Sequence, residues 1–130
     1  NDYGEEYGIE VRVLSRLSSE EMCSVMRNAA AIVGLAHGEA FGLTPIEAMA
    51  LGVPPIFVNE GGFCETIIDG ENGRLIDRGK YDQWTEALVQ AKNIDIREKW
   101  ARSGIERIEQ LGLTPGNHSI RLYEEIMRIY

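Results

Sequence analysis

The stretch LAHGEAFGLTPIEAMALG, residues 35–52, decides the fold, because it passes from a glycine-bearing loop into a helix with a strong start signal. Thr44 is a preferred N-cap residue, Pro45 suits the first helical position, and Glu47 three residues after Thr44 completes a capping box. We therefore predict that a helix starts at Pro45. The apolar run at 30–35 precedes the loop, so the predicted order is strand, loop and helix.

A loop of this kind is suited to bind phosphate, because backbone N–H groups and the positive end of a helix dipole point to one place. Two carboxylates, Glu39 and Glu47, flank that place with seven residues between them. Direct contact of either carboxylate with a phosphate would be repulsive, whereas both can accept hydrogen bonds from neutral hydroxyl groups. Sugars supply such hydroxyls, so the stretch indicates a ligand that carries both phosphate and sugar.

Three segments of the sequence together resemble a known family. EAFGLTPIEAMA at 39–50, GVP at 52–54 and EGGFCETIIDGENG at 60–73 are similar to the donor-binding domain of retaining glycosyltransferases of family four, which have a GT-B fold and a Glu-x7-Glu motif. The resemblance covers 9–92 well. It implies a nucleotide diphospho-sugar donor, transfer of a hexose to a glycan, lipid or other acceptor, and neither a cofactor nor a metal.

The resemblance also implies a role for each matched position. Glu39 is expected to face the donor sugar as the catalytic carboxylate, and Glu47 to bind the ribose hydroxyls. An Arg and a Lys that hold the pyrophosphate in the family have no counterpart in a matching context here. The remaining assignments are sugar and phosphate binding by Phe41, Gly42, Leu43, Thr44, Gly61 and Gly62, and nucleobase binding by Arg16 and Leu17.

The residues themselves leave alternatives open. Glu47 alone would be a capping-box residue, and Glu39 alone a solvated loop carboxylate. His37 is interpreted as an ordinary loop histidine. At the level of function, the alternatives are a non-catalytic module that binds a nucleotide or nucleotide-sugar, and a flavodoxin-like or receiver-like signalling domain.

The composition is that of one soluble globular domain, with 130 residues, 44% hydrophobic and 26% charged. The net charge of -8 argues against a nucleic-acid partner or an anionic membrane surface, which require basic patches. No apolar run reaches the roughly eighteen residues of a transmembrane segment. Cys23 and Cys64 fit no metal or redox spacing, so we expect a cytoplasmic protein with reduced thiols.

The chain alternates predicted strands with predicted helices, which indicates an α/β fold with a Rossmann-like doubly wound parallel sheet and flanking helices. The continuous apolar runs at 31–35 and 55–58 are typical of strands buried on both faces. Residues 1–8 are interpreted as a polar connection. The expected strands are 9–14, 31–35, 55–58 and 74–77, and the expected helices are 18–28, 45–51, 64–68, 81–92, 96–111 and 114–130.

The whole chain, 1–130, is interpreted as a single partial donor-binding domain from the C-terminal half of a GT-B fold. The N-terminal acceptor-binding domain of the family is expected to be missing. The segment 114–130 is expected to be a C-terminal crossing helix. Its apolar face predicts an exposed patch or a self-association contact, formed by Tyr123, Ile126, Met127 and Tyr130.

We expect this chain alone to catalyse no sugar transfer, because the acceptor site and the basic pair would lie outside it, while weak nucleotide binding remains. The measurement is a radiolabelled-donor assay with a broad set of acceptors. Transfer at a rate normal for the family would contradict the interpretation as a partial domain.

Overall fold

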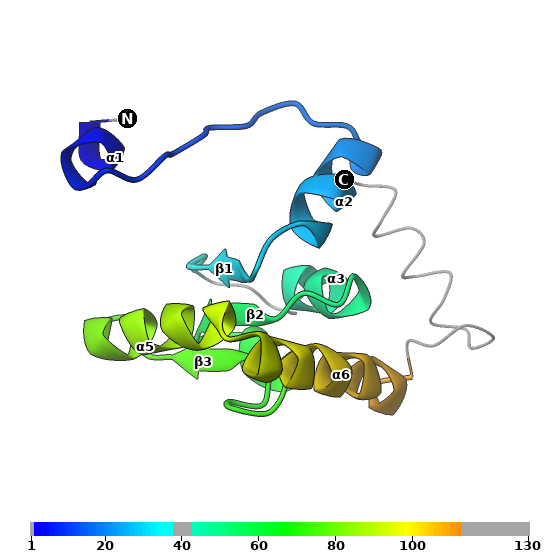
Figure 1. Ribbon diagram of the computed structural model, residues 1–130. Coiled ribbons are helices and arrows are strands. Elements are labelled where there is room, and N and C mark those ends of the chain that lie inside the picture. Colours follow the sequence, from blue (N-terminus) through cyan, green and yellow to red (C-terminus); the bar gives the residue numbers. More distant parts are fainter. Residues whose placement is uncertain (1, 38–42, 113–130) are drawn as a thin grey trace.

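The computed structural model describes residues 2–37 and 43–112. Its centre is a three-stranded parallel sheet in the order β1-β2-β3, which confirms the predicted parallel α/β architecture with flanking helices (Figure 1). The strands are β1 (Ile32–Gly34), β2 (Pro55–Val58) and β3 (Arg74–Ile76). The helices are α1 (Asp2–Tyr7), α2 (Ser19–Arg27), α3 (Leu43–Ala50), α4 (Phe63–Thr66), α5 (Tyr81–Lys92) and α6 (Ile94–Gln110).

The central strand β2 is buried along its whole length, as its apolar run predicted. Successive side chains of a strand point to opposite faces of the sheet. On one face, Phe57 packs in a cluster with Met49 of α3, Phe63 of α4 and Ile108 of α6. On the other face, Ile56 packs in a second cluster with residues of β3, α5 and α6, namely Ile76, Ala87, Ala91 and Trp100. Helices therefore cover both faces of the sheet.

Gly104 allows α6 to lie close to α3. A Cβ atom built at Gly104 would lie 3.1 Å from Cγ of Met49, closer than most such contacts. Glycine costs a helix interior about 1 kcal/mol relative to alanine, so its presence in α6 has a packing reason. The close approach brings the last helix that the structure describes against the helix that follows β1.

The predicted capping box around Glu47 is wrong, because α3 begins at Leu43 and Thr44 lies inside the helix. Proline is tolerated anywhere in the first turn, where N–H groups have no partner in the helix, so Pro45 did not fix the first position. For the preceding helix the sequence predicts a serine cap at Ser18 or Ser19, and the structure shows the cap at Ser18, where Glu21 completes a capping box. Ser18 Oγ accepts a hydrogen bond from the N–H of Glu21 over 3.1 Å.

The predicted strand at 9–14 is absent, and this segment runs as exposed chain between α1 and α2, away from the sheet (Figure 1). A strand requires a neighbour to pair its backbone groups, and no strand of the described ranges pairs with it. Residues 2–7, expected to be an irregular connection, form α1. The strand β1 is an edge of the described sheet, so Val33 is 47% exposed and not buried on both faces as predicted.

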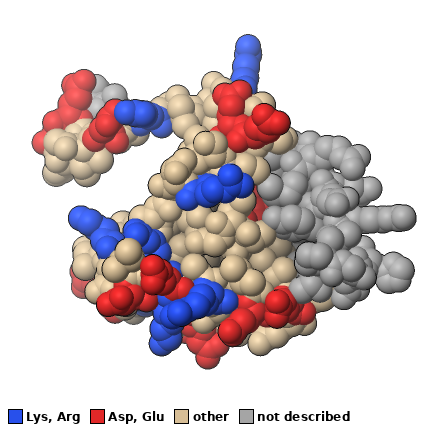
Figure 2. Space-filling model, turned by 45° about the vertical axis from the view of Figure 1, so that its right-hand side comes forward, with Lys and Arg blue, Asp and Glu red and all other residues tan. Residues whose placement is uncertain are grey.

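Two predicted features lie outside the described residues: the crossing helix at 114–130 with its apolar face, and the part of the glycine-bearing loop at 38–42. None of the described helices is both long enough and apolar enough to cross a membrane. On the face in Figure 2, the Lys and Arg side chains are interspersed with Asp and Glu side chains.

We expect Gly34→Ala to lower the free energy of unfolding by about 1–3 kcal/mol, because a Cβ at this position would overlap the ring of Phe57 on the neighbouring strand. Gly79→Ala is the matched control, since a Cβ there meets no atom within 4 Å. Urea unfolding followed by circular dichroism gives both values. An unchanged midpoint for Gly34→Ala would show that the sheet does not require this close approach.

Candidate functional site

The three parallel strands end at the same edge of the sheet, and the segments that follow them meet there. The segment after β1 leads into α3, the segment after β2 leads into α4, and the segment after β3 leads into α5. Ligands of open α/β sheets bind beyond the carboxyl ends of the strands. The segments 35–37, 59–62 and 77–79 make up this edge, the strand-end rim.

Glu47 is a buried carboxylate in the helix that follows β1. It lies in α3, next to the core residues Ile46 and Met49, and only 2% of its surface is exposed. Its Oε1 atom has no hydrogen-bond partner among the described residues. Burial without a compensating partner disfavours the ionised form and raises the pKa of Glu47 from 4.5 to about 7.

The start of α3 lies at the rim, because the helix follows β1 and leads back to the start of β2. Leu43 and Thr44 form its first two positions, where backbone N–H groups have no partner within the helix. The first turn of a helix attracts negative charge, and α3 is eight residues long. Glu39, Phe41 and Gly42, the other predicted members of this part of the site, lie outside the described residues.

Gly61 and Gly62 form the turn between β2 and α4. Gly61 has a φ of 57°, a backbone conformation that is energetically unfavourable for residues with a Cβ atom. Neither glycine N–H donates to a backbone acceptor within the part of the chain that the structure describes. The turn therefore brings two backbone donors to the rim. The structure thus places Gly61 and Gly62 at the same edge of the sheet as the start of α3.

Arg78 was not predicted from the sequence, yet it makes the densest set of polar contacts that we find at the described rim. Its guanidinium donates to both carboxylate oxygens of Glu60, from Nε over 3.0 Å and from Nη2 over 2.9 Å. Nη1 donates to the carbonyl of Leu35 over 2.9 Å, and Nη2 lies 3.2 Å from Nδ1 of His37. His37 is a loop histidine, as predicted, and it contacts this polar cluster.

The Arg78 fork has the electrostatic effect expected of a charge-assisted pair. Its hydrogen bonds and charge hold the pKa of the Glu60 carboxyl below its ordinary value, although desolvation acts in the opposite direction. The only sequence signal for Arg78 was its place two residues after β3, the position that parallel sheets bring to the rim. The same signal applies to Glu60, which is two residues after β2.

Arg16 and Leu17, predicted to contact a nucleobase, stand immediately before the N-cap of α2. The strand expected to lead to them is absent, so the described sheet does not carry them to the rim as a strand end would. Arg16 is exposed and has a φ of 57°, which is uncommon for a residue with a side chain. Their assignment to the nucleobase remains a prediction.

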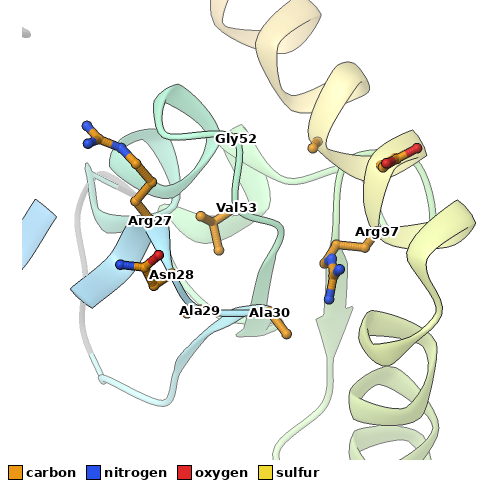
Figure 3. Close-up of a pocket in the computed structure, with 9 residues that line it drawn as sticks. Arg27, Asn28, Ala29, Ala30, Gly52, Val53 and Arg97 are labelled. Carbon is orange, nitrogen blue, oxygen red and sulfur yellow. The ribbon is translucent and has the colours of Figure 1, made fainter. Parts of the chain in front are cut away.

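A separate cavity of about 390 Å³ lies at the opposite ends of the strands, where Ala30 precedes β1 and Val53 precedes β2 (Figure 3). Two arginines border it, but Arg27 points away from Arg97, so they do not converge on one anion. Within the described ranges, no group of three or more His, Cys, Asp or Glu side chains is placed to hold a metal ion. The strand-end rim is therefore the candidate site.

Comparison with known proteins agrees with this geometry. The sequence profile of glycosyl transferases group 1 matches residues 3–107. Alpha-1,3/1,6-mannosyltransferase alg-2 of Neurospora crassa is 33% identical over 67% of the chain, and a D-inositol 3-phosphate glycosyltransferase of Corynebacterium diphtheriae is 35% identical over 74%. The chain spans only 18% and 23% of the length of these two relatives.

Solved structures share the fold. The C-terminal domain of a glycosyl transferase group 1 family protein (LpcC) from Francisella tularensis superposes with a TM-score of 0.69 at 26% identity, over 84% of this chain and 58% of that one. Sucrose-phosphate synthase from Thermosynechococcus elongatus gives a TM-score of 0.69 at 25% identity, over 99% of this chain and 34% of that one. The chain therefore belongs to the glycosyl transferases group 1 family, and its fold is that of a GT-B C-terminal domain.

Proposed function

We propose that this domain binds the nucleotide diphospho-sugar donor of a retaining hexosyltransferase at its strand-end rim. The observation that carries the proposal is Glu47, a carboxylate that is 2% exposed and has an oxygen without a partner among the described residues. The acceptor and the particular hexose are properties of the whole protein. The relatives indicate only the general class of each. Membership of the family supports the reaction type, which is transfer of a glycosyl group.

Glu47 is proposed to bind the ribose of the donor. A buried carboxylate without a partner destabilises the free domain, and two neutral hydroxyl groups can donate to its oxygens without adding charge. A phosphate at the same position would add a second negative charge in a desolvated place. The chemistry of Glu47 therefore favours the sugar hydroxyls of a nucleotide over its phosphates.

The diphosphate is proposed to lie against backbone N–H groups. The first turn of α3 at Leu43 and Thr44 and the turn at Gly61 and Gly62 supply such donors at one edge of the sheet. These donors are fixed in place before the ligand arrives, so they stabilise the charge that develops on the leaving diphosphate without reorganisation. The proposal requires no metal ion.

Glu39 is proposed to act at the anomeric carbon of the donor sugar. In the transfer, the bond from this carbon to the diphosphate oxygen breaks, a bond to the acceptor oxygen forms on the same face, and the proton of the acceptor hydroxyl passes to the departing diphosphate. A carboxylate beside the carbon stabilises positive charge in the transition state. Glu39 and Glu47 then have separate partners, the hexose and the ribose, and substitutions should separate their effects.

We expect Glu47→Gln to weaken binding of GDP or UDP by about 1.5–3 kcal/mol, because the neutral amide loses charge-assisted hydrogen bonds. The ionised carboxylate is the better acceptor, so the affinity of the unmodified domain should rise with pH up to about 7 and level off above it. Calorimetry from pH 5.5 to 8.5 tests both expectations.

The ligand phosphate also titrates in this pH range, and it does so equally with the unmodified domain and with Glu47→Gln. The difference between the two pH profiles therefore reports the titration of Glu47 alone. Glu71→Gln, at an exposed position, is the matched control for loss of one carboxylate. The same pH profile and affinity in Glu47→Gln as in the unmodified protein would exclude Glu47 from the nucleotide site.

We expect Glu39→Gln to leave affinity for the bare nucleoside diphosphate nearly intact, because its proposed partner is the hexose. In the natural full-length protein, the same substitution should depress kcat far more than it weakens donor binding. Steady-state kinetics together with calorimetry measures both. Small and equal losses in the Glu39 and Glu47 variants would remove the basis for both roles, and an unmodified full-length protein without turnover would favour a non-catalytic binding module.

A further inference from the structure

One guanidinium group joins all three segments of the strand-end rim. Arg78 follows β3, Glu60 follows β2, and Leu35 directly follows β1. The chain separates Arg78 from Glu60 by 18 residues and from Leu35 by 43 residues, so the contacts are tertiary. A substitution at Arg78 would therefore remove the side-chain contacts that join the segments after the three strands.

The geometry of the Arg78 contacts distinguishes it from an ordinary surface ion pair. Arg78 and Glu60 form a fork with two parallel hydrogen bonds of 3.0 and 2.9 Å, and their side chains are only 36% and 37% exposed. A third donor holds the Leu35 carbonyl at 2.9 Å. Lysine cannot reproduce this arrangement, because its ammonium group is one point of charge and not a planar fork.

Arg78 has little capacity left for a ligand. A guanidinium carries five N–H groups; here three of them donate to Glu60 and Leu35, and Nη2 also lies 3.2 Å from Nδ1 of His37. Its positive charge is balanced by Glu60 at close range. Arg78 is therefore better suited to fix other groups than to bind a phosphate itself.

The groups that Arg78 fixes adjoin the proposed diphosphate donors. Glu60 directly precedes Gly61 and Gly62, so orienting the Glu60 side chain also restrains the turn that presents these two N–H groups. The Leu35 carbonyl restrains the chain where β1 ends. We propose that Arg78 is a positioning residue that, through Glu60 and Leu35, holds the strand-end rim in the geometry that binds a nucleoside diphosphate. This proposal rests on the proposed function.

Substitution of Glu60 distinguishes a positioning role of Arg78 from direct binding of phosphate by Arg78. If Arg78 bound phosphate itself, removing the competing carboxylate in Glu60→Ala would free the guanidinium and strengthen nucleoside diphosphate binding. If Arg78 acts by positioning, Glu60→Ala removes its main partner and weakens binding. The sign of the Glu60→Ala effect therefore separates the two roles.

The test is calorimetry of the natural full-length protein with GDP, UDP and ADP, and competition measurements with the corresponding nucleosides. We expect Arg78→Ala, Arg78→Lys and Glu60→Ala each to weaken diphosphate binding by roughly tenfold, since a small misplacement of fixed donors is costly. The double variant Arg78→Ala, Glu60→Ala should be no weaker than either single variant, because both remove the same fork. Nucleoside affinity should not change, whereas general loss of structure would lower it too.

Arg102→Ala is the matched control, since Arg102 is exposed on α6 and its loss changes the net charge equally. Unchanged diphosphate affinity in Arg78→Ala, rescue by Arg78→Lys, or tighter binding in Glu60→Ala would each overturn the positioning role while the proposed function stands. Failure of the unmodified protein to bind any of the three diphosphates would instead overturn the proposed function, and the positioning role with it.

Discussion

The edge-to-face contact between Phe57 and Phe63, with ring centroids 4.7 Å apart, connects the core of this domain to its candidate site. Phe57 lies in the fully buried strand β2, and Phe63 begins α4. The turn with Gly61 and Gly62 lies between them in the chain, so burial of the two rings fixes both ends of that turn. Aromatic pairs of this geometry contribute beyond the area that they bury. The position of the turn is therefore a consequence of core packing.

Glu60, at the strand-end rim, and Glu47, in the helix that follows β1, are held in opposite electrostatic states. Glu60 has the Arg78 fork, which favours its ionised form and lowers its pKa. Glu47 is buried in α3, and desolvation raises its pKa to about 7. The Glu60 carboxylate is paired with Arg78, whereas Oε1 of Glu47 has no hydrogen-bond partner among the described residues. Both residues are glutamates, so the opposite pKa shifts come from their different surroundings.

Local signals in the sequence predicted much of the fold. The helix at 81–92 matches α5, and Ser18, one of the two predicted cap residues, caps α2, because such features depend on residues within one turn of each other. The apolar run at 55–58 predicted a strand buried on both faces, since only a covered parallel strand tolerates it. The strand predicted from the alternating pattern at 9–14 is wrong, because a strand needs a neighbouring strand to pair with. A local pattern cannot show whether such a neighbour exists.

The sequence by itself determined the parallel α/β class, the glycine turn after β2 and the place of Glu47 in a helix after β1, because periodicity and helix signals act over a few residues. Only the tertiary structure decided that Glu47 is buried with no partner for Oε1 in the ranges that the structure describes, and that Arg78 contacts Glu60, Leu35 and His37. Burial and long-range hydrogen bonds depend on which elements pack together. Those contacts join residues up to 43 positions apart, a distance at which local sequence patterns carry no information about contact.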